Sequence, residues 1–245
     1  MRKCVYFFLL FGLIFTIFNC TKQVNTGGGI QPSPVVLVPG VADTCRVERG
    51  IDAIPEGNVI RIEWIPSSEE EVAGYEIYRG VDNKTGPYNL IAGLTVLTVT
   101  DSFFVDGPVS LNKRYYYYIL AVTYDDDKSA PSDTLDYQLI QKAANLLPRG
   151  ETNDSRPDFS WEDPNSPPKA YYVVRLVEVA SGDIIWISLV PSSYNPNRET
   201  VLFNADGTAT ADSLFSSIDY QWRVDIIGSE DNSGSESNWV ALRLQ

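Results

Sequence analysis

The sequence contains no histidine, only three cysteines, and 19 lysines and arginines against 32 aspartates and glutamates. The lack of histidine excludes Ser-His and Cys-His catalytic pairs, imidazole metal sites and histidine pH switches. The formal net charge of −13 argues against nucleic acids and against electrostatic binding to anionic lipids. The chain is therefore short of the groups that most hydrolases and nucleic-acid-binding proteins use.

Motifs for phosphate and metal binding are also missing. Gly27–Gly29 has no following Lys-Ser or Lys-Thr, so it is not a phosphate-binding loop. The acidic clusters at 69–71 and 125–127 lack the spaced Asp-x-Asp-x-Asp-Gly pattern of a calcium loop, and we interpret them as solvated turns. Nothing marks any Asp or Glu as buried. We expect no enzyme activity, no metal and no cofactor.

The chain begins with a positive segment, Met1–Lys3, followed by an apolar run over residues 4–18 and a polar stretch from Asn19. A helix over this run reaches roughly 22 Å, which is short of the roughly 30 Å hydrocarbon core of a bilayer. This pattern favours a removable export signal over a membrane-spanning helix.

The segment Ile17-Phe18-Asn19-Cys20 resembles the cleavage motif of bacterial lipoprotein precursors, although Asn19 stands where that family prefers Gly or Ala. The resemblance implies a signal peptide over 1–19 and acylation of Cys20, with two or three acyl chains holding the protein firmly to a membrane of the cell envelope. Thr21-Lys22 lacks the aspartate that retains such proteins in the inner membrane of enteric bacteria, which favours the outer membrane. The alternatives are an uncleaved signal anchor, or secretion with Cys20 incidental.

Acylation of Cys20 would leave Cys45 without an internal partner, because Cys4 lies in the signal. We expect Cys45 to be a small buried residue near the first strand, with an intermolecular disulfide as the alternative. A disulfide framework and a cysteine zinc site are then excluded.

Residues 20–38 contain Gly27–Gly29 and two prolines, Pro32 and Pro34, and are predicted to be a flexible tether. The remaining residues form two predicted domains, 39–139 and 140–245. Only a few residues near 139–143 would join them, packed end to end.

Short alternating runs separated by turn residues predict β-strands throughout both halves. In the run 60–64, Ile60, Ile62 and Trp64 share one face. The second half repeats this order, with one predicted strand that ends at Trp161 and a next one that begins at Tyr172. Tyr115 and Tyr220 each begin a strand and follow Val109 and Leu214 by six residues, so each tyrosine can hydrogen-bond back to the preceding connection. The predicted cores are Trp64, Tyr75, Ile77, Tyr115, Tyr117, Ile119 and Ala121 in the first half, and Phe159, Trp161, Tyr172, Val174, Leu176, Tyr220, Trp222 and Val224 in the second.

The first half resembles fibronectin type III domains in Trp64, the run 74–79, Gly86-Pro87-Tyr88, Tyr115–Tyr118 and Ser129-x-Pro131-Ser132. The second half is a looser relative. The resemblance implies an all-β chain of two tandem antiparallel immunoglobulin-like sandwiches, a fold that carries many unrelated roles.

If Tyr115 and Tyr117 point inward, Tyr116 and Tyr118 point outward. In the fibronectin type III arrangement the strand carrying Tyr78 is adjacent, so Tyr78, Tyr116, Tyr118 and Leu120 are predicted to form an exposed binding face. Tyrosine is favoured at interfaces. The alternative is that these side chains only cover the sheet surface or pack on the second domain. The equivalent face of the second domain carries Gln221, Arg223 and Asp225.

We therefore expect a lipid-anchored envelope protein that acts in adhesion or as a protein-interaction scaffold. Its partners would be the membrane and an envelope protein or glycan. The alternative function is a carbohydrate-binding accessory protein that uses the tyrosines of the first domain.

Overall fold

The computed structural model describes residues 31–194 and 198–245, and these residues form seventeen strands and no helix. None of the described segments is a helix long and apolar enough to cross a membrane. The predicted signal peptide, Cys20 and the tether up to residue 30 lie outside the described residues.

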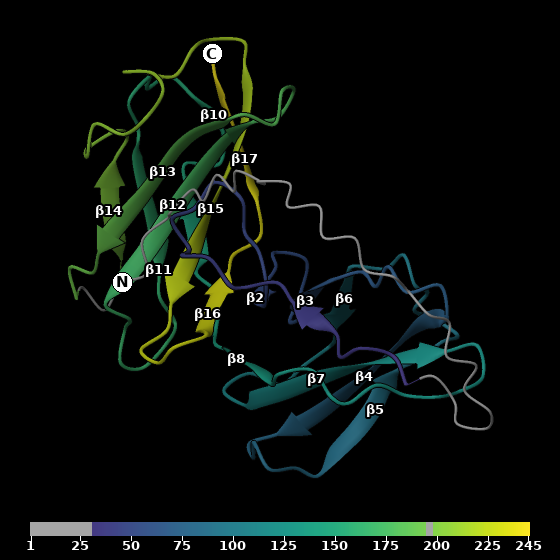
Figure 1. The fold of residues 1–245 in the computed structure, drawn as a ribbon. Coiled ribbons are helices and arrows are strands. Elements are labelled where there is room, and N and C mark those ends of the chain that lie inside the picture. Colours follow the sequence, from purple (N-terminus) through teal and green to yellow (C-terminus); the bar gives the residue numbers. More distant parts are fainter. Residues whose placement is uncertain (1–30, 195–197) are drawn as a thin grey trace, which may run out of the picture.

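The first domain packs two sheets against each other (Figure 1). In one sheet the central strand β3 (Ile60–Ile65) pairs antiparallel with three others, namely β1 (Val36–Leu37), β2 (Asp52–Ala53) and β6 (Phe103–Asp106). The other sheet has the strand order β8-β7-β4-β5, made of β8 (Leu135–Leu139), β7 (Arg114–Thr123), β4 (Val72–Val81) and β5 (Tyr88–Ala92).

The second domain repeats this arrangement. Its smaller sheet has the order β14-β11-β9, made of β14 (Glu199–Leu202), β11 (Asp158–Glu162) and β9 (Ala144–Leu147). The larger sheet contains β10 (Gly150–Thr152), β12 (Tyr171–Glu178), β13 (Ile184–Pro191), β15 (Asp219–Ile227), β16 (Ser233–Glu236) and β17 (Val240–Leu244). The chain is thus all-β, with two immunoglobulin-like β-sandwiches.

Alternation along the strands builds the two cores, and all fifteen predicted core residues are buried. The same aromatic pair recurs in each domain. Trp64 meets Tyr75 edge to face with ring centroids 5.2 Å apart, and Trp161 meets Tyr172 at the same separation. Edge-to-face pairs at this distance contribute about 0.5–1.5 kcal/mol beyond area burial. The internal repeat in the sequence therefore corresponds to the same side-chain packing in the two cores.

The predicted tyrosine hydrogen bonds form in both domains. The backbone N–H of Ser110 donates to the Tyr115 hydroxyl oxygen at 2.9 Å, and the N–H of Phe215 donates to that of Tyr220 at 3.1 Å. Each bond ties the start of a core strand to the connection before it.

The end of the predicted tether belongs to the fold. Val35 is buried in the first core, and β1 pairs Val36 with Ile65. Proline and glycine content indicated a tether up to residue 38, but the apolar run that follows Pro34 completes a sheet edge.

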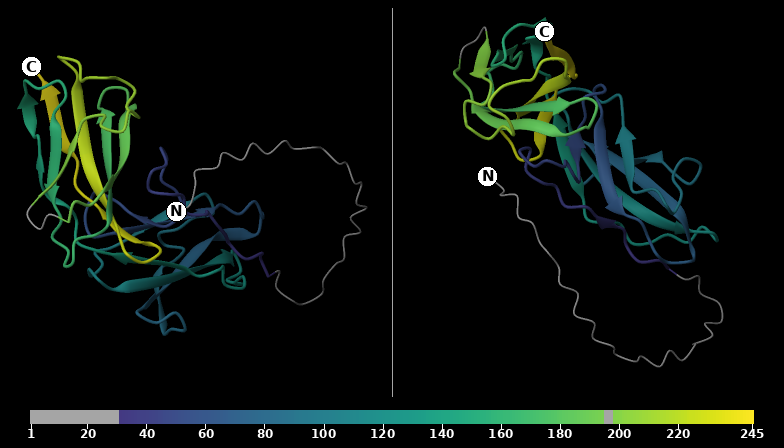
Figure 2. Two further views of the ribbon diagram at one scale, coloured as in Figure 1. Left: turned by 90° about the vertical axis from the view of Figure 1, so that its left-hand side faces the viewer. Right: turned by 90° about the horizontal axis from the view of Figure 1, so that it is seen from above.

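The junction between the domains is more extensive than a short connection. Strand β16 of the second domain pairs parallel with β8 of the first, which links the larger sheets of both domains. Across this link the N–H of Gln138 donates to the carbonyl of Asn232 at 2.9 Å, and that of Ile140 to Gly234 at 3.0 Å. The result is a bent molecule in which the C-terminus lies at the far end of the second domain (Figure 2).

Candidate functional site

The predicted tyrosines lie together on the outer face of the β8-β7-β4-β5 sheet. Tyr78 on β4 is directly opposite Tyr118 on β7, and their rings stack at 4.9 Å with an interplanar angle of 13°. Tyr116 lies two residues before Tyr118 on the same face of β7, opposite Gly80. All three side chains are half-buried.

Sequence reasoning did not place Tyr88 on this face, because Gly86-Pro87-Tyr88 served only as part of the resemblance to fibronectin type III domains. Its ring lies 4.9 Å from that of Tyr118. A Cβ at Gly80 would approach the Tyr88 ring to 3.2 Å, so the glycine lets this ring lie across β4. We call Tyr78, Tyr88, Tyr116 and Tyr118 the tyrosine face.

Leu120 does not belong to an exposed face, because only 9% of its surface is exposed. It lies opposite Glu76, which accepts hydrogen bonds from the Tyr78 hydroxyl at 2.8 Å and from Lys128 Nζ at 2.7 Å. The tyrosine face therefore ends at a Glu76–Lys128 ion pair instead of continuing as an apolar stripe.

The hydroxyls of Tyr78, Tyr88 and Tyr118 remain protonated at neutral pH. Burial raises the pKa of Tyr78, Tyr88 and Tyr118, and the carboxylate of Glu76 raises the pKa of Tyr78 and Tyr118 further. The stacking of Tyr78 on Tyr118 covers one face of each of these two rings.

The equivalent face of the second domain is covered by a segment of the first. Arg175 on β12 and Arg223 and Asp225 on β15 are all buried, because residues 43–48 of the first domain fold over them. We define the junction cluster as Asp43, Glu48, Asp52, Arg175, Arg223, Asp225 and Glu236.

The two arginines organise this cluster. Arg175 Nε donates to Asp225 at 2.8 Å, its Nη2 pairs with Glu48 at 2.8 Å, and its guanidinium also donates to the backbone carbonyls of Cys45 and Asp43. Arg223 pairs with Asp225 at 2.9 Å, with Glu236 at 2.7 Å and with Glu48. Buried guanidinium groups need carboxylate and carbonyl partners of this kind.

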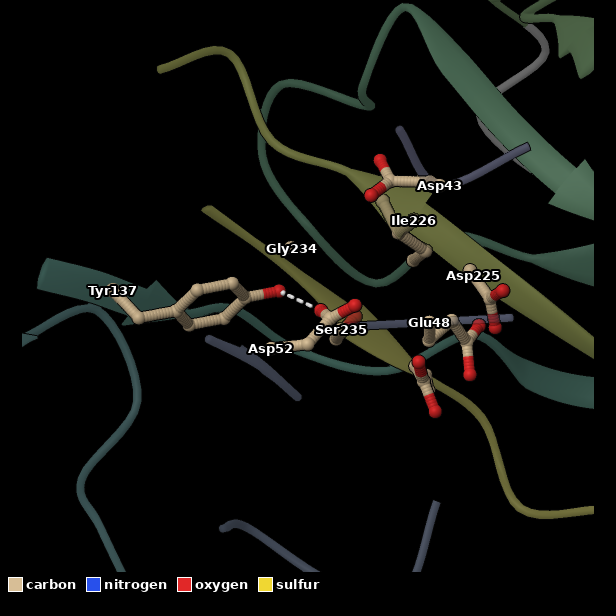
Figure 3. A pocket seen from close by; sticks show the side chains of 9 residues that line it. Asp43, Glu48, Asp52, Tyr137, Asp225, Ile226, Gly234 and Ser235 are labelled. Carbon is tan, nitrogen blue, oxygen red and sulfur yellow. Dashed lines mark hydrogen bonds between the residues drawn. The ribbon is translucent and has the colours of Figure 1, made fainter. Parts of the chain in front are cut away.

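The carboxyl groups of the cluster line a small cavity with room for about one water-sized molecule (Figure 3). Figure 3 shows Tyr137 reaching from β8 to Asp52, and its hydroxyl donates to Asp52 Oδ1 at 3.0 Å. A cavity this small cannot hold the sugar ring that a glycosidase with paired carboxylates would cleave.

Burial and mutual repulsion raise the pKa values of three of these carboxyl groups, those of Asp43, Asp52 and Glu236. The pKa of Asp43 rises to about 6, through burial and then the charge of Asp225. The pKa of Asp52 rises to about 8, through burial and then the charges of Asp43 and Glu48. Burial and Asp225 also raise the pKa of Glu236, and Arg223 opposes this shift.

The sequence marked no Asp or Glu as buried. Among the described residues, five acidic side chains are buried, namely Glu63, Asp106, Glu199, Asp225 and Glu236. Oxygens of Glu48, Asp225 and Glu236 lie within 4.8 Å of one another, and each of these carboxylates is paired with the guanidinium group of Arg175 or Arg223. The sequence offered one signal for this site, the alternation that puts Arg223 and Asp225 on the same face of β15.

The expectation for Cys45 is also wrong. The residue is half-buried and takes part in a disulfide, so it is neither fully buried nor a free thiol. The other two cysteines, Cys4 and Cys20, lie outside the described residues.

Comparison with known proteins shows only that the fold of this chain is similar to known folds. No protein-family model and no curated protein sequence matches the chain. Among solved structures, an Fn3-like protein from Clostridium thermocellum matches at 22% identity and a TM-score of 0.30, covering 36% of this chain and 84% of that one. The FN1–FN3 domains of chicken CNTN1 match at 12% identity and a TM-score of 0.32, covering 87% of this chain and 67% of that one.

Proposed function

We propose that this protein is a non-catalytic lipoprotein of the bacterial cell envelope, more specifically of the outer membrane. Its two sandwiches act as a scaffold that presents the tyrosine face to a protein partner. The observation that carries the proposal is the clustering of four half-buried tyrosines on one sheet face, beside the Glu76–Lys128 pair.

The geometry of the rings favours a protein over a glycan. Sugar binding on an aromatic platform needs an open ring face, and the stacking of Tyr78 on Tyr118 removes one face of each of these rings. Protein interfaces use tyrosine as a rigid side chain that contributes both apolar area and a hydroxyl donor. The protonated hydroxyls of Tyr78, Tyr88 and Tyr118 suit that role.

The first experiment is capture of partners from native envelope by the full chain and by the double variant Tyr116→Ser/Tyr118→Ser. Interface tyrosines that act as hot spots cost about 2 kcal/mol or more when they are truncated, so we expect capture of the partner to weaken about tenfold or more. Tyr171→Ser is the matched control, because Tyr171 is 44% exposed but lies on β12 of the second domain. Undiminished capture by a folded double variant would reject the tyrosine face, and selective loss of glycan-array binding would support the carbohydrate alternative.

The second experiment tests the anchor by mass spectrometry of the protein isolated from its envelope. We expect an N-terminal peptide that begins at acylated Cys20 and cofractionates with the outer membrane. An acylated sulfur cannot also form a disulfide. A peptide with Met1 intact, or Cys20 joined to Cys45, would contradict lipidation without bearing on the tyrosine face.

A further inference from the structure

The junction cluster holds more acidic than basic groups. Five carboxyl groups line its cavity, and the cationic groups that face them are two guanidinium groups and one ammonium group. The groups facing one another are Asp43 and Glu48 before β2, Asp52 on β2, Tyr137 on β8, Lys142 between β8 and β9, Arg175 on β12, Arg223 and Asp225 on β15, and Glu236 on β16. Full ionisation would therefore leave uncompensated negative charge inside the junction.

These carboxyl groups come from both sides of the junction. Asp43, Glu48 and Asp52 belong to the first domain, whereas Asp225 and Glu236 belong to the second. Lys142 is already occupied, since its Nζ donates to the backbone carbonyls of Ile54 and Pro55 at 3.1 and 2.8 Å. Repulsion among ionised carboxylates would consequently push the two domains apart.

We propose that the junction is a proton-operated latch, which holds the two sandwiches together when the cavity carboxyls are protonated and loosens when they ionise. The residues that respond are Asp43 and Asp52. They lack the direct arginine contacts that Asp225 and Glu236 make through their own carboxylates.

The direction in which pH changes the stability of the junction follows from proton binding. Ordinary Asp carboxyls ionise near pH 4, so with the domains apart both groups are charged above about pH 5. In the docked junction burial raises the pKa of Asp43 to about 6 and that of Asp52 to about 8. Docking thus takes up protons, and its stability is greatest at mildly acid pH and falls as the pH rises through these two values.

The test is hydrogen exchange of the mature chain, followed at the amides of Gln138 and Ile140, whose bonds cross the junction. After correction for the intrinsic effect of pH, we expect these amides to exchange about tenfold or more faster at about pH 8 than at about pH 5. The amide of Trp64, which bonds Ser102 within the first domain, is the internal control and should not respond.

Asp52→Asn and Asp43→Asn mimic the protonated side chains and should each flatten this pH dependence, with protection kept at about pH 8. Asp125→Asn in an exposed turn is the matched control and should change nothing. The latch is wrong if corrected exchange at Gln138 and Ile140 is independent of pH, or if both folded variants keep the full dependence. It is also wrong if millimolar calcium replaces protons in protecting the junction and a chelator reverses this.

Discussion

Arg223→Ala is expected to lower the free energy of unfolding by about 3–5 kcal/mol at neutral pH, because it leaves buried carboxylates without their partner. Arg223 is 3% exposed, pairs with Glu48, Asp225 and Glu236, and packs against the ring of Trp239. The measurement is urea denaturation of the two proteins. The loss should shrink at mildly acid pH, where the orphaned carboxyls can bind protons instead.

Arg243→Ala provides the control for Arg223→Ala. Arg243 pairs with Asp219 at 3.1 Å, but both side chains are about half exposed or more. Exposed pairs of this kind contribute about 0–1 kcal/mol. If the two substitutions destabilise the protein equally, the junction cluster does not stabilise the fold in the way its geometry indicates.

Trp64→Ala is expected to destabilise the first domain by about 3–5 kcal/mol, since truncation leaves a large cavity in a packed core. Trp64 is 1% exposed and packs edge to face on Tyr75. This loss is a large part of the roughly 5–15 kcal/mol that stabilises a typical domain. Thermal unfolding followed by circular dichroism measures it.

Ile65→Ala tests whether this loss comes from the core. Ile65 is the next residue of β3, but its side chain is on the opposite face and is 54% exposed. We expect a change below about 1 kcal/mol. If Trp64→Ala and Ile65→Ala destabilise the protein equally, the two side chains do not differ in burial as the structure indicates.

Much of the fold could be predicted because side chains alternate along a strand. The pattern of Ile60, Ile62 and Trp64 already specifies which face is buried, whatever the neighbouring strands are. The same rule put Tyr116 and Tyr118 on the outer side of β7 once Tyr115 and Tyr117 were assigned to the core. The tyrosine hydrogen bonds were equally accessible, since each joins residues five apart in the chain.

The sequence by itself thus determined the strands, the two cores and the side of the sheet on which the tyrosines lie, because these depend on local alternation. Tertiary structure alone decided that Leu120 is buried, that Tyr88 joins the tyrosine face, and that Arg175, Arg223 and Asp225 lie inside a junction. Arg175 meets Cys45 across 130 residues and Arg223 meets Glu48 across 175. An outward-facing residue becomes buried only when a distant segment folds over it, and local periodicity carries no information about that segment.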